Sequence, residues 1–473
     1  MDRERLYGML LSAFGFTPTQ GQATALRHLA AFILSKKNNP TYILRGYAGT
    51  GKTTLTSAIV NTLPQIGMGY VIMAPTGRAA KVIAGYTQQK ASTIHKRLYR
   101  ATAMPDGSIR MARSENKMKN TLFIVDEASM ISDTNELGSR SLLDDLIEYI
   151  FSGENCRLLL IGDSAQLPPV ETEYSPALDI DHMKSSYDLT IAQYELTEVM
   201  RQSLQSGILA TATQLREMMS HNDYEYYLPI FHLSGYGDIK RIEPETFEEL
   251  LYKSFDQDAD AVVVCKSNKR ANMFNQAIRS RILNIEGEIA TGDKIMVVKN
   301  NYYWNDTDNK INFIANGDMA VIEKISKFEE LYGFRFADVD ISLCDYNDAP
   351  KMTVKILLDT LGSESPSLSR EEWQRLASAI EEDYLDIPNR RERYKEMKKN
   401  PWFNALQVKF AYALTCHKTQ GGQWQDVFID SPFNLKDTLE HGDLRWLYTA
   451  TTRARKKLYL VNFKDEFFDQ KPD

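Results

Sequence analysis

The sequence has few cysteines and no long hydrophobic run. Only four of its 473 residues are cysteine, and they stand far apart, at Cys156, Cys265, Cys344 and Cys416. No zinc or iron–sulfur spacing is present, and the scattered thiols indicate a reducing, cytoplasmic setting. No apolar run approaches the roughly 20 residues that span a bilayer, and the N-terminus has no signal-peptide pattern. We therefore expect no membrane association.

The sequence also lacks an excess of positive charge. It has 56 Lys and Arg against 63 Asp and Glu, which gives a net charge of −7. A nucleic-acid partner would therefore have to be bound in a local groove and not by a global field. The content of hydrophobic residues (43%) and of charged residues (25%) is ordinary for a globular protein, and the length is sufficient for two to four domains.

A glycine loop between an apolar run and a helical segment organises the first part of the chain. Tyr42–Leu44 is typical of a buried strand, the pattern Gly46-x-x-x-x-Gly51-Lys52-Thr53 follows it, and Thr54–Val60 is compatible with a helix. Strand, glycine loop and helix in this order are the context of a phosphate-binding loop. The sequence therefore predicts a nucleoside triphosphate site.

The residues of this loop have distinct roles in that prediction. A side chain at Gly49 or Gly51 would obstruct the backbone N–H groups that turn toward an anion. The helix that begins near Lys52 adds the positive end of its dipole. Lys52 would reach the β- and γ-phosphates, and the hydroxyl of Thr53 would bind Mg²⁺.

Two carboxylates follow a second apolar run. Thr121–Val125 is expected to be a strand that delivers Asp126 and Glu127 to its carboxyl end, which is the edge of an open α/β sheet where ligands bind. Asp126 is suited to hold Mg²⁺, and Glu127 is suited to polarise an attacking water. Gln166 follows the expected strand Arg157–Gly162, where its amide could sense the γ-phosphate.

Strand–helix repeats predict two parallel-sheet domains of the α/β class with insertions. The first domain includes a strand at Gly69–Ala74, and in the second half strands are expected at Ala261–Val264, Val408–Leu414, Val427–Ile429 and Leu458–Val461, with a helix at Lys269–Ile282. Between these segments, four short strands at the spacing of a small barrel are expected at Gly292–Val298, Asp318–Ile325, Phe336–Ser342 and Met352–Leu358. Ser369–Lys399 is a charged helical stretch that we interpret as a solvated face.

Residues 100–120 interrupt the strand–helix series. Asp106-Gly107 is typical of a tight hairpin turn, and the segment contains Arg100, Arg110 and Arg113. Met104 and Pro105 would form an apolar tip at this turn, able to lie against a base pair. The alternative is an ordinary surface loop.

Taken together, these segments resemble the motifs of the superfamily 1 helicases, in the family's order. The similar segments are Gln22, Gly46–Thr54 (motif I), Ala74–Lys81 (Ia), Ser92–His95 (Ib), Ile124–Met130 (II), Gly162–Val170 (III), Leu196–Gln202 (IV), Thr415–Gln423 (V) and Leu447–Arg455 (VI). The TIH of motif Ib, the HKTQG of motif V and the NGD turn at Asn316–Asp318 resemble the RecD/Dda-type branch, superfamily 1B. One departure is Gly77, where some relatives have a histidine.

The resemblance implies two RecA-like domains with two insertions. Domain 1A would comprise residues 1–99 and 121–190, and residues 100–120 would form a small β-hairpin (pin) domain, 1B. Domain 2A would comprise residues 191–290 and 403–473, and residues 291–402 would form an SH3-like β-barrel, 2B, with a helical extension. Hydrolysis of ATP would be tied to closure of the cleft between the RecA-like domains.

The resemblance also implies the residues of the site. The nucleotide would be bound by Gln22, Gly49, Thr50, Gly51, Lys52, Thr53, Thr54, Gly421 and Gln423, with Mg²⁺ on Thr53 and Asp126. Lys52, Glu127, Gln166, Arg201 and Arg453 would be catalytic, with Arg453 as the arginine finger. DNA would be bound by Pro75, Thr76, Thr93, His95, Met104, Pro105, Thr415, His417 and Lys418. The aromatic residues Tyr302, Tyr303 and Trp304 would either pack in the core of the barrel or stack on bases.

The function implied is that of an ATP-dependent DNA helicase that moves 5′→3′ on single-stranded DNA. The expected partners are single-stranded DNA and junctions between single and double strands, together with replication or repair proteins, and the chain would act as a monomer. An RNA-directed motor of superfamily 1B remains an alternative because backbone contacts need not distinguish the sugar. A DNA-stimulated ATPase that translocates or displaces proteins without separating strands is a second alternative.

Overall fold

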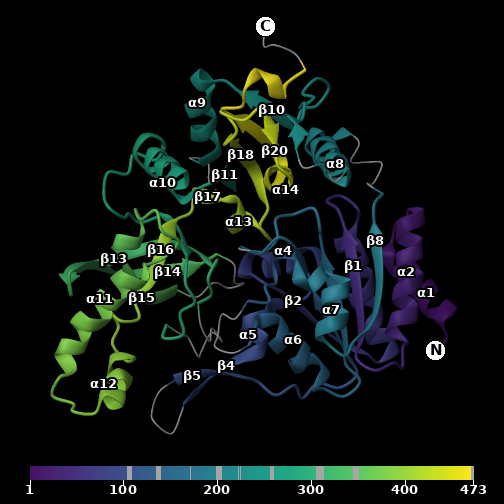
Figure 1. Ribbon diagram of the computed structural model, residues 1–473, viewed down its shortest axis with the longest axis horizontal. Helices are drawn as coiled ribbons and strands as arrows, with labels where there is room; N and C mark the ends of the chain where they lie inside the picture. Colours follow the sequence, from purple (N-terminus) through teal and green to yellow (C-terminus); the bar gives the residue numbers. More distant parts are fainter. Residues whose placement is uncertain are drawn as a thin grey trace.

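The computed structural model describes residues 1–103, 109–134, 140–170, 172–198, 205–221, 223, 225–255, 260–304, 314–344 and 351–469. Within these ranges the chain forms two parallel sheets with helices on their faces, a closed barrel and a helical extension (Figure 1). The predicted α/β fold with two parallel sheets and a small barrel is confirmed.

The first sheet has six parallel strands in the order β3-β2-β6-β7-β1-β8. The strands are β1 Pro40–Gly46, β2 Gly69–Ala74, β3 Ala91–Thr93, β6 Thr121–Val125, β7 Arg157–Gly162 and β8 Thr190–Leu196. Its helices are α1 Arg3–Phe14, α2 Gln20–Ile33, α3 Lys52–Thr62, α4 Gly77–Thr87, α5 Ile94–Leu98, α6 Leu142–Phe151 and α7 Ile180–Ser186. Successive residues of β1 point to opposite faces, so Leu44 packs with α1–α3 and Ile43 packs with α6. Both faces of the sheet are therefore covered.

The edge strand β8 corrects the predicted domain boundary. Thr190–Leu196 pairs in parallel along the whole length of β1, from Pro40↔Thr190 to Gly46↔Leu196. These residues therefore belong to the first sheet, although the predicted division began the second RecA-like domain, with its segment 191–290, inside this strand. The strand escaped prediction because only its last residue, Leu196, is fully buried, so the sequence lacks the apolar run of a central strand.

The second sheet has five parallel strands in the order β10-β20-β18-β11-β17. The strands are β10 Ile239–Ile242, β11 Ala261–Cys265, β17 Ala413–Thr415, β18 Trp424–Asp430 and β20 Ala454–Val461. The associated helices are α8 Gly207–Ser220, α9 Pro244–Phe255, α10 Asn268–Ala277, α13 Cys416–Thr419 and α14 His441–Thr451, and a short ribbon pairs β9 Tyr226–Tyr227 with β19 Thr438–Leu439. The helix expected at Lys269–Ile282 is α10 followed by a π-helical turn, Ile278–Ile282.

The barrel contains one strand more than predicted. It consists of β12 Lys294–Val297, β13 Met319–Leu331, β14 Phe334–Leu343, β15 Lys351–Leu357 and β16 Leu406–Phe410. The prediction of a single strand at Val408–Leu414 is wrong, because the chain divides there into β16, which closes the barrel against β12, and β17 in the second sheet. The segment 403–410 therefore contributes to the barrel and not to the second sheet.

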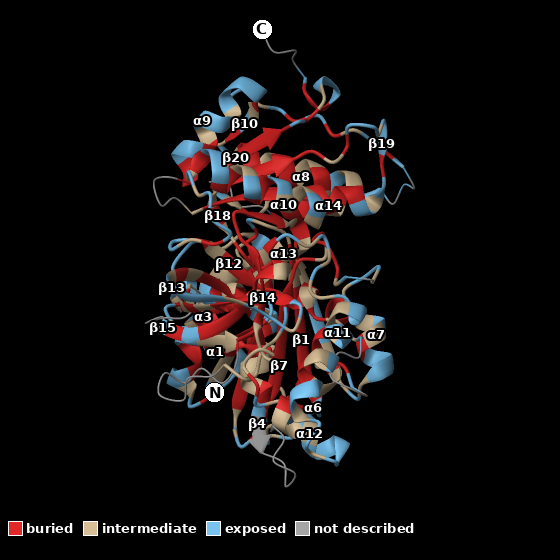
Figure 2. Ribbon diagram, turned by 90° about the vertical axis from the view of Figure 1, so that its left-hand side faces the viewer, coloured by how far each residue is buried: buried red, intermediate tan, exposed pale blue. Residues whose placement is uncertain are grey.

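The helical extension is not simply a solvated face. It contains α11 Arg370–Glu381 and α12 Arg390–Met397, which Figure 1 shows at the lower left. Leu376, Ile380 and Met397 are buried in a cluster with Phe334 and Phe336 of the barrel. One side of the extension is therefore packed on the barrel while the other faces solvent, as the exposed colouring of α12 in Figure 2 illustrates. The prediction overlooked the apolar residues that recur at helical spacing among the charges.

A hairpin leaves the first sheet after α5. Its strands, β4 Tyr99–Ala103 and β5 Ile109–Arg113, pair antiparallel from Tyr99↔Arg113 to Ala103↔Ile109. The predicted hairpin is thus present, whereas its turn, with Met104 and Pro105, lies outside the described residues. Within the described ranges, no helix has the length and apolar character needed to cross a membrane.

Candidate functional site

The phosphate loop connects β1 to α3, and its glycines leave no room for side chains. Gly51 has a left-handed φ of 88°, and a Cβ there would lie 2.5 Å from Nε2 of Gln22. A Cβ on Gly46 would lie 2.9 Å from the hydroxyl of Thr50. Both positions therefore require glycine, for conformation at Gly51 and for space at both. The half-buried Thr53 and Thr54 stand in the first turn of α3, whose N-terminal amides face the loop.

Lys52 and Gln22 are both bonded to the backbone of this loop. The Lys52 ammonium donates to the carbonyl oxygens of Gly46, at 2.5 Å, and Tyr47, at 3.0 Å. The Gln22 amide donates to the carbonyl of Thr50 at 3.0 Å and accepts from the backbone N–H of Thr19 in a capping box. Gln22, which was predicted to bind the nucleotide, thus supports the loop directly in this conformation.

Asp126 and Glu127 follow β6, two strands from β1 in the sheet. Burial, with a smaller contribution from the neighbouring charge of Glu127, raises the pKa of Asp126 to about 7, and Lys52 opposes this shift. Glu127 has a φ of 53°, a left-handed conformation that is uncommon for a residue with a side chain. Such a conformation is typical of functional sites, where it aims a side chain in a direction that regular backbone does not allow.

The residues around the loop fit a nucleotide with a divalent cation. Two adjacent carboxyls and the hydroxyl of Thr53 are oxygen ligands of the kind that Mg²⁺ prefers. The buried amide oxygen of Gln166 and the hydroxyl of Ser129 have no hydrogen-bond partner among the described residues. Thr53 and Asp126 would hold the metal, as predicted, and Gln166 is oriented by its position after β7.

The second sheet contacts the phosphate loop through α14. The hydroxyl of Tyr448 accepts from the backbone N–H of Ala48 at 2.9 Å and donates to the carboxylate of Asp163 at 2.6 Å. On the same helix, the hydroxyl of Thr449 accepts from the N–H of Leu167 at 2.9 Å. These contacts bring the segments similar to motifs I, III and VI together across the cleft between the two sheets.

Arg453 lies just after α14 and is almost completely buried, with 3% of its surface exposed. Its guanidinium donates to the carbonyls of Thr449, at 3.0 Å, and Gly422, at 3.2 Å, and to the hydroxyl of Thr452 at 3.0 Å. These groups all belong to the second sheet region, so the side chain is held close to the cleft by its own domain. Arg201, the other predicted catalytic arginine, lies outside the described residues.

Comparison with known proteins agrees with this geometry. A family model described as an AAA domain matches residues 17–228, and one described as a UvrD-like helicase C-terminal domain matches residues 410–461. The ATP-dependent DNA helicase dda of Enterobacteria phage T4 is 27% identical over 470 residues, which cover 94% of this chain and 99% of the relative. These similarities support the superfamily 1B helicase resemblance.

Two further matches differ in how much of each protein they cover. The ATP-dependent RecD2 DNA helicase of Deinococcus radiodurans is 26% identical over 317 residues, which cover 65% of this chain and 38% of the relative. A crystal structure of the Pif1 helicase from Bacteroides, in complex with ADP-AlF3 and ssDNA, aligns over 96% of this chain and 95% of its own, with 15% identity and a TM-score of 0.48.

In this chain, the predicted nucleotide-binding residues Gly421 and Gln423 contact α4. A Cβ on Gly421 would lie 2.7 Å from that of Ala79, and the Gln423 amide oxygen lies 3.4 Å from the hydroxyl of Tyr86. No hydrogen bond in the described part of the chain joins either residue to the phosphate loop. Their role in nucleotide binding stays a prediction.

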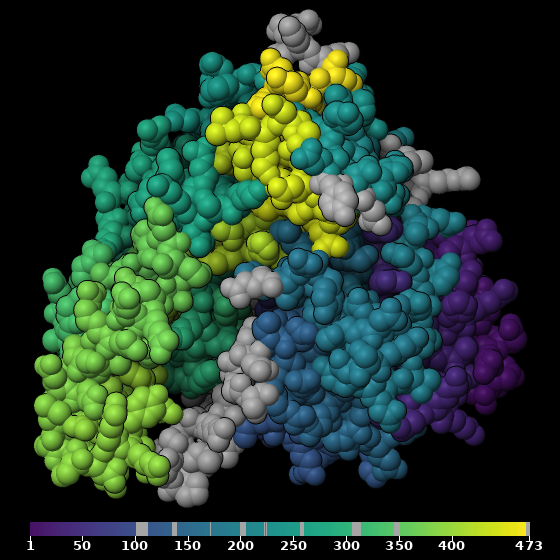
Figure 3. Space-filling model, viewed as in Figure 1, coloured from purple at the N-terminus to yellow at the C-terminus, as the bar shows by residue number. Residues whose placement is uncertain are grey.

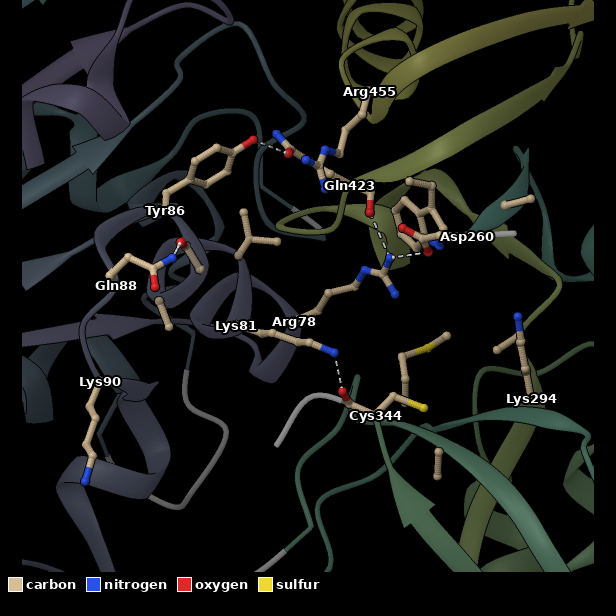
Figure 4. A pocket seen from close by; sticks show the side chains of 18 of the residues that line it. Arg78, Lys81, Tyr86, Gln88, Lys90, Asp260, Lys294, Cys344, Gln423 and Arg455 are labelled. Carbon is tan, nitrogen blue, oxygen red and sulfur yellow. Dashed lines mark hydrogen bonds and ion pairs between the residues drawn. The ribbon is translucent and has the colours of Figure 1, made fainter. Parts of the chain in front are cut away.

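Arg78 ties α4 to the second sheet, as Figure 4 shows. Its guanidinium donates to the carbonyl of Gln423 at 2.8 Å, pairs with Asp260 at 3.2 Å and lies 3.9 Å from the ring centroid of Trp424. These contacts border a cavity of about 820 Å³ between α4, the second sheet and the barrel. Arg78 therefore connects the segment after β2, which is similar to motif Ia, to the segment similar to motif V.

The predicted DNA-binding threonines are helix caps. The hydroxyl of Thr76 accepts from the N–H of Ala79 at 3.2 Å, and that of Thr93 accepts from the N–H of Lys96 at 3.1 Å. Pro75 precedes the first of these caps, and Thr415 is the N-cap residue of α13. Thr76, Thr93 and Thr415 stand at the carboxyl ends of β2, β3 and β17, so the structure brings them to the edges at which the two sheets face each other.

Burial lowers the pKa values of the remaining predicted DNA-binding side chains, His95, His417 and Lys418, and so affects which of them are charged. Burial lowers the pKa of His95 to about 4 and also lowers that of His417, so both rings are neutral at pH 7. Burial and the nearby charge of Lys409 lower the pKa of Lys418 to about 8. Lys418 is therefore the cation of this group, whereas the histidines can contribute hydrogen bonds or packing only.

The three residues of the aromatic cluster differ in their surroundings. The indole N–H of Trp304 donates to the carbonyl of Asn404 at 2.8 Å, and its ring packs against the barrel core. Tyr302 and Tyr303, in contrast, line a second cavity.

Sequence reasoning missed three residues of this site: Asp163, Tyr448 and Arg78. All three lie inside segments similar to helicase motifs, so their position was a signal. Their partners, however, come from another domain in each case, and local sequence does not reveal them.

Proposed function

We propose that this chain is an ATP-driven DNA helicase that moves 5′→3′ along a single strand and separates duplexes. The proposal is supported by similarity to two DNA helicases, among them the T4 helicase, to which the chain is similar over nearly its whole length. The observation that carries it is the pair of hydrogen bonds by which Tyr448 of the second domain contacts the phosphate loop and Asp163 of the first domain across the cleft. A site shared between two domains links hydrolysis to their relative movement.

The proposed chemistry is divided among residues of the two domains. Lys52 would neutralise the transferring phosphate, and Glu127 would orient and deprotonate the attacking water. Thr53 and Asp126 would hold Mg²⁺, whose chemistry there would be to offset the negative charge of the phosphates. Arg453 and Arg201 would complete the charge stabilisation from the other side of the cleft only when it closes.

The proposed track for the strand follows the ends of β2, β3 and β17. Pro75, Thr76, Thr93, His95, Thr415, His417 and Lys418 would hold the sugar–phosphate backbone without reading its sequence. Repeated closure of the cleft against a strand held on both domains would produce stepping. The hairpin β4–β5 would act as the wedge, with Met104 and Pro105 at its tip.

Unwinding assays on tailed duplexes test this function. We expect DNA to stimulate ATP hydrolysis more than RNA of the same sequence, and duplexes with a 5′ tail to be separated in preference to those with a 3′ tail. Stronger stimulation by RNA would favour the RNA-directed motor. DNA-stimulated hydrolysis without separation of either duplex would favour a translocase or protein-displacing clamp.

A turn replacement tests the wedge. Replacing Met104–Ser108 by a short Gly-Ser turn is expected to spare DNA-stimulated ATP hydrolysis and to abolish duplex separation, because the strand track does not include the turn. Unwinding at the wild-type rate would assign the wedge to another part of the chain.

A further inference from the structure

A cavity of about 590 Å³ lies where the root of the hairpin, the barrel and the helical extension meet. We call it the hairpin-root cavity. It is lined by Tyr99, Arg113, Asp145, Lys299, Asn300, Asn301, Tyr302, Tyr303, Trp373, Lys395, Lys398, Lys399, Phe403, Asn404, Ala405 and Gln407. Figure 3 shows the two sides from which these residues come, the green barrel and extension at the lower left and the blue part of the first domain beside them.

The lining of the cavity contains more cationic than anionic side chains. Asp145 is engaged by the Tyr99 hydroxyl at 2.7 Å and by Arg113 at 3.4 Å, and Lys399 pairs with Glu396 at 2.8 Å. For Lys299, Lys395 and Lys398, in contrast, no ion pair is formed within the described ranges. Three cations from the barrel and α12 thus face a cavity whose carboxylate is already neutralised, which favours an anionic occupant.

Aromatic rings alternate with these cations. The ammonium of Lys299 lies 4.2 Å from the ring centroid of Trp373, and the ring of Tyr303 meets that of Trp304 edge-on at 4.8 Å. The side-chain amide of Asn301, just before the tyrosines, donates to the carbonyl of Asn404 at 2.8 Å and so connects this segment to the end of the helical extension. Half-buried rings beside unpaired lysines are the combination by which proteins bind single-stranded nucleic acid, through stacking and phosphate contacts together.

The cavity lies next to one residue of the proposed DNA track. The ring of Tyr99, which lines the cavity, lies 5.7 Å from that of His95, one of the predicted DNA contacts. On the opposite wall, the side-chain oxygen of Asn300 accepts from the N–H of Asn316 in the NGD turn at 2.7 Å. A strand that leaves the track at His95 would therefore enter this cavity at the foot of the hairpin.

We propose that the hairpin-root cavity binds the unpaired nucleotides next to a single/double-strand junction, with a base stacked on Tyr303 and phosphates near Lys395 and Lys398. This inference rests on the proposed helicase function, because it assumes that the strand follows the track. It assigns to the barrel and the helical extension a direct part in recognising the junction.

Fluorescence of a base analogue at the junction tests the stacking. The full chain is mixed with a 5′-tailed duplex that carries 2-aminopurine at the unpaired position next to the duplex. We expect binding to quench the probe, Tyr303→Leu to remove the quenching and to weaken binding roughly 5-fold or more, and Tyr303→Phe to retain both. Equal quenching by wild type and Tyr303→Leu would overturn the stacking assignment.

Salt dependence of binding tests the lysines. The double variant Lys395→Ala/Lys398→Ala is expected to lower the slope of log K against log salt by about two for the tailed duplex. The matched control is Lys36→Ala/Lys37→Ala, which removes the same charge from an exposed loop before β1. An unchanged slope, or an equal loss for tailed and blunt duplexes, would overturn the proposal, the second result because it would place paired DNA in the cavity.

A further comparison separates failure of this inference from failure of the proposed function. If wild type lacks DNA-stimulated ATP hydrolysis, the helicase proposal fails. If wild type hydrolyses ATP and unwinds while the cavity variants bind the tailed duplex as wild type does, only the cavity assignment fails.

Discussion

The hydroxyl of Tyr448 lies 2.9 Å from the backbone nitrogen of Ala48, a residue 400 positions earlier in the chain. The same hydroxyl donates to Asp163, which is almost completely buried. One phenol thus satisfies a loop amide and a carboxylate that both belong to the other domain. In this conformation the cleft contains a polar network, and a bound nucleotide would have to share the loop amides with it.

Removal of the Tyr448 hydroxyl should destabilise the folded chain. Tyr448→Phe leaves the N–H of Ala48 and one oxygen of Asp163 unpaired, a cost of about 1–3 kcal/mol in the free energy of unfolding. The control is Tyr42→Phe, since the buried hydroxyl of Tyr42 has no hydrogen-bond partner among the described residues. Urea unfolding should show a lower midpoint for Tyr448→Phe and no loss for Tyr42→Phe. Equal midpoints in the two variants would contradict the assigned bonds.

Substitutions in the phosphate loop and after β6 should separate binding from turnover. Lys52→Ala should remove ATP hydrolysis and leave binding of single strands largely intact, because the lysine serves the phosphates and not the DNA. Glu127→Gln should retain ATP binding but stop turnover, because an amide cannot deprotonate water. Steady-state hydrolysis and binding of a labelled nucleotide measure both effects, and hydrolysis at the wild-type rate in Glu127→Gln would refute its role.

Arg453 and Arg455 form a matched pair for the arginine-finger hypothesis. Arg453→Ala should lower turnover by roughly 10³-fold, a typical arginine-finger effect, with a much smaller change in ATP affinity. Arg455 is exposed and lines the cavity of Figure 4, so Arg455→Ala should leave turnover nearly unchanged. Because Arg453 is also bonded to its own domain, thermal unfolding of both variants should be measured. If the Arg453→Ala chain folds and hydrolyses ATP at the normal rate, the arginine-finger hypothesis is wrong and the role of Arg453 is structural.

Binding of single strands should weaken as the pH rises through about 8. Burial and Lys409 lower the pKa of Lys418 to that value, so the ammonium is charged below it and loses its charge above it. A phosphate contact needs the charged form, and therefore affinity falls with increasing pH. Lys418→Arg keeps its charge and should flatten this dependence. An equal decrease in both proteins would exclude Lys418 as the titrating group.

The nucleotide site was predictable because its signals are local. An apolar run, a glycine loop and a helix start are consecutive in sequence, and they place Lys52 and Thr53 without knowledge of the rest of the chain. Asp126 and Glu127 follow from the rule that parallel strands end at a common edge. The roles of these residues stay predictions, as do those of Gly421 and Gln423, whose observed contacts are with α4.

The parts that escaped prediction depend on partners distant in the sequence. The edge strand β8 has little buried surface to mark it, and its place beside β1 is decided by pairing across about 150 residues of chain. The segment from Leu406 to Thr415 has one continuous β-favouring pattern, although it serves two sheets. Similarly, the residues next to Arg78 in sequence do not indicate that its side chain contacts Trp424 and Asp260.

The junction between β16 and β17 has a mechanical consequence. Only Ala411 and Tyr412 separate the last barrel strand from a strand of the second sheet. Tyr412 is fixed at both ends, since its N–H donates to Asn275 at 3.1 Å and its hydroxyl donates to Asp293 at 3.0 Å. A joint of two residues with these bonds restricts rotation of the barrel against the second sheet. We therefore expect a force on the barrel or its extension to be transmitted to Thr415 and α13, the part of the chain that is proposed to hold the strand.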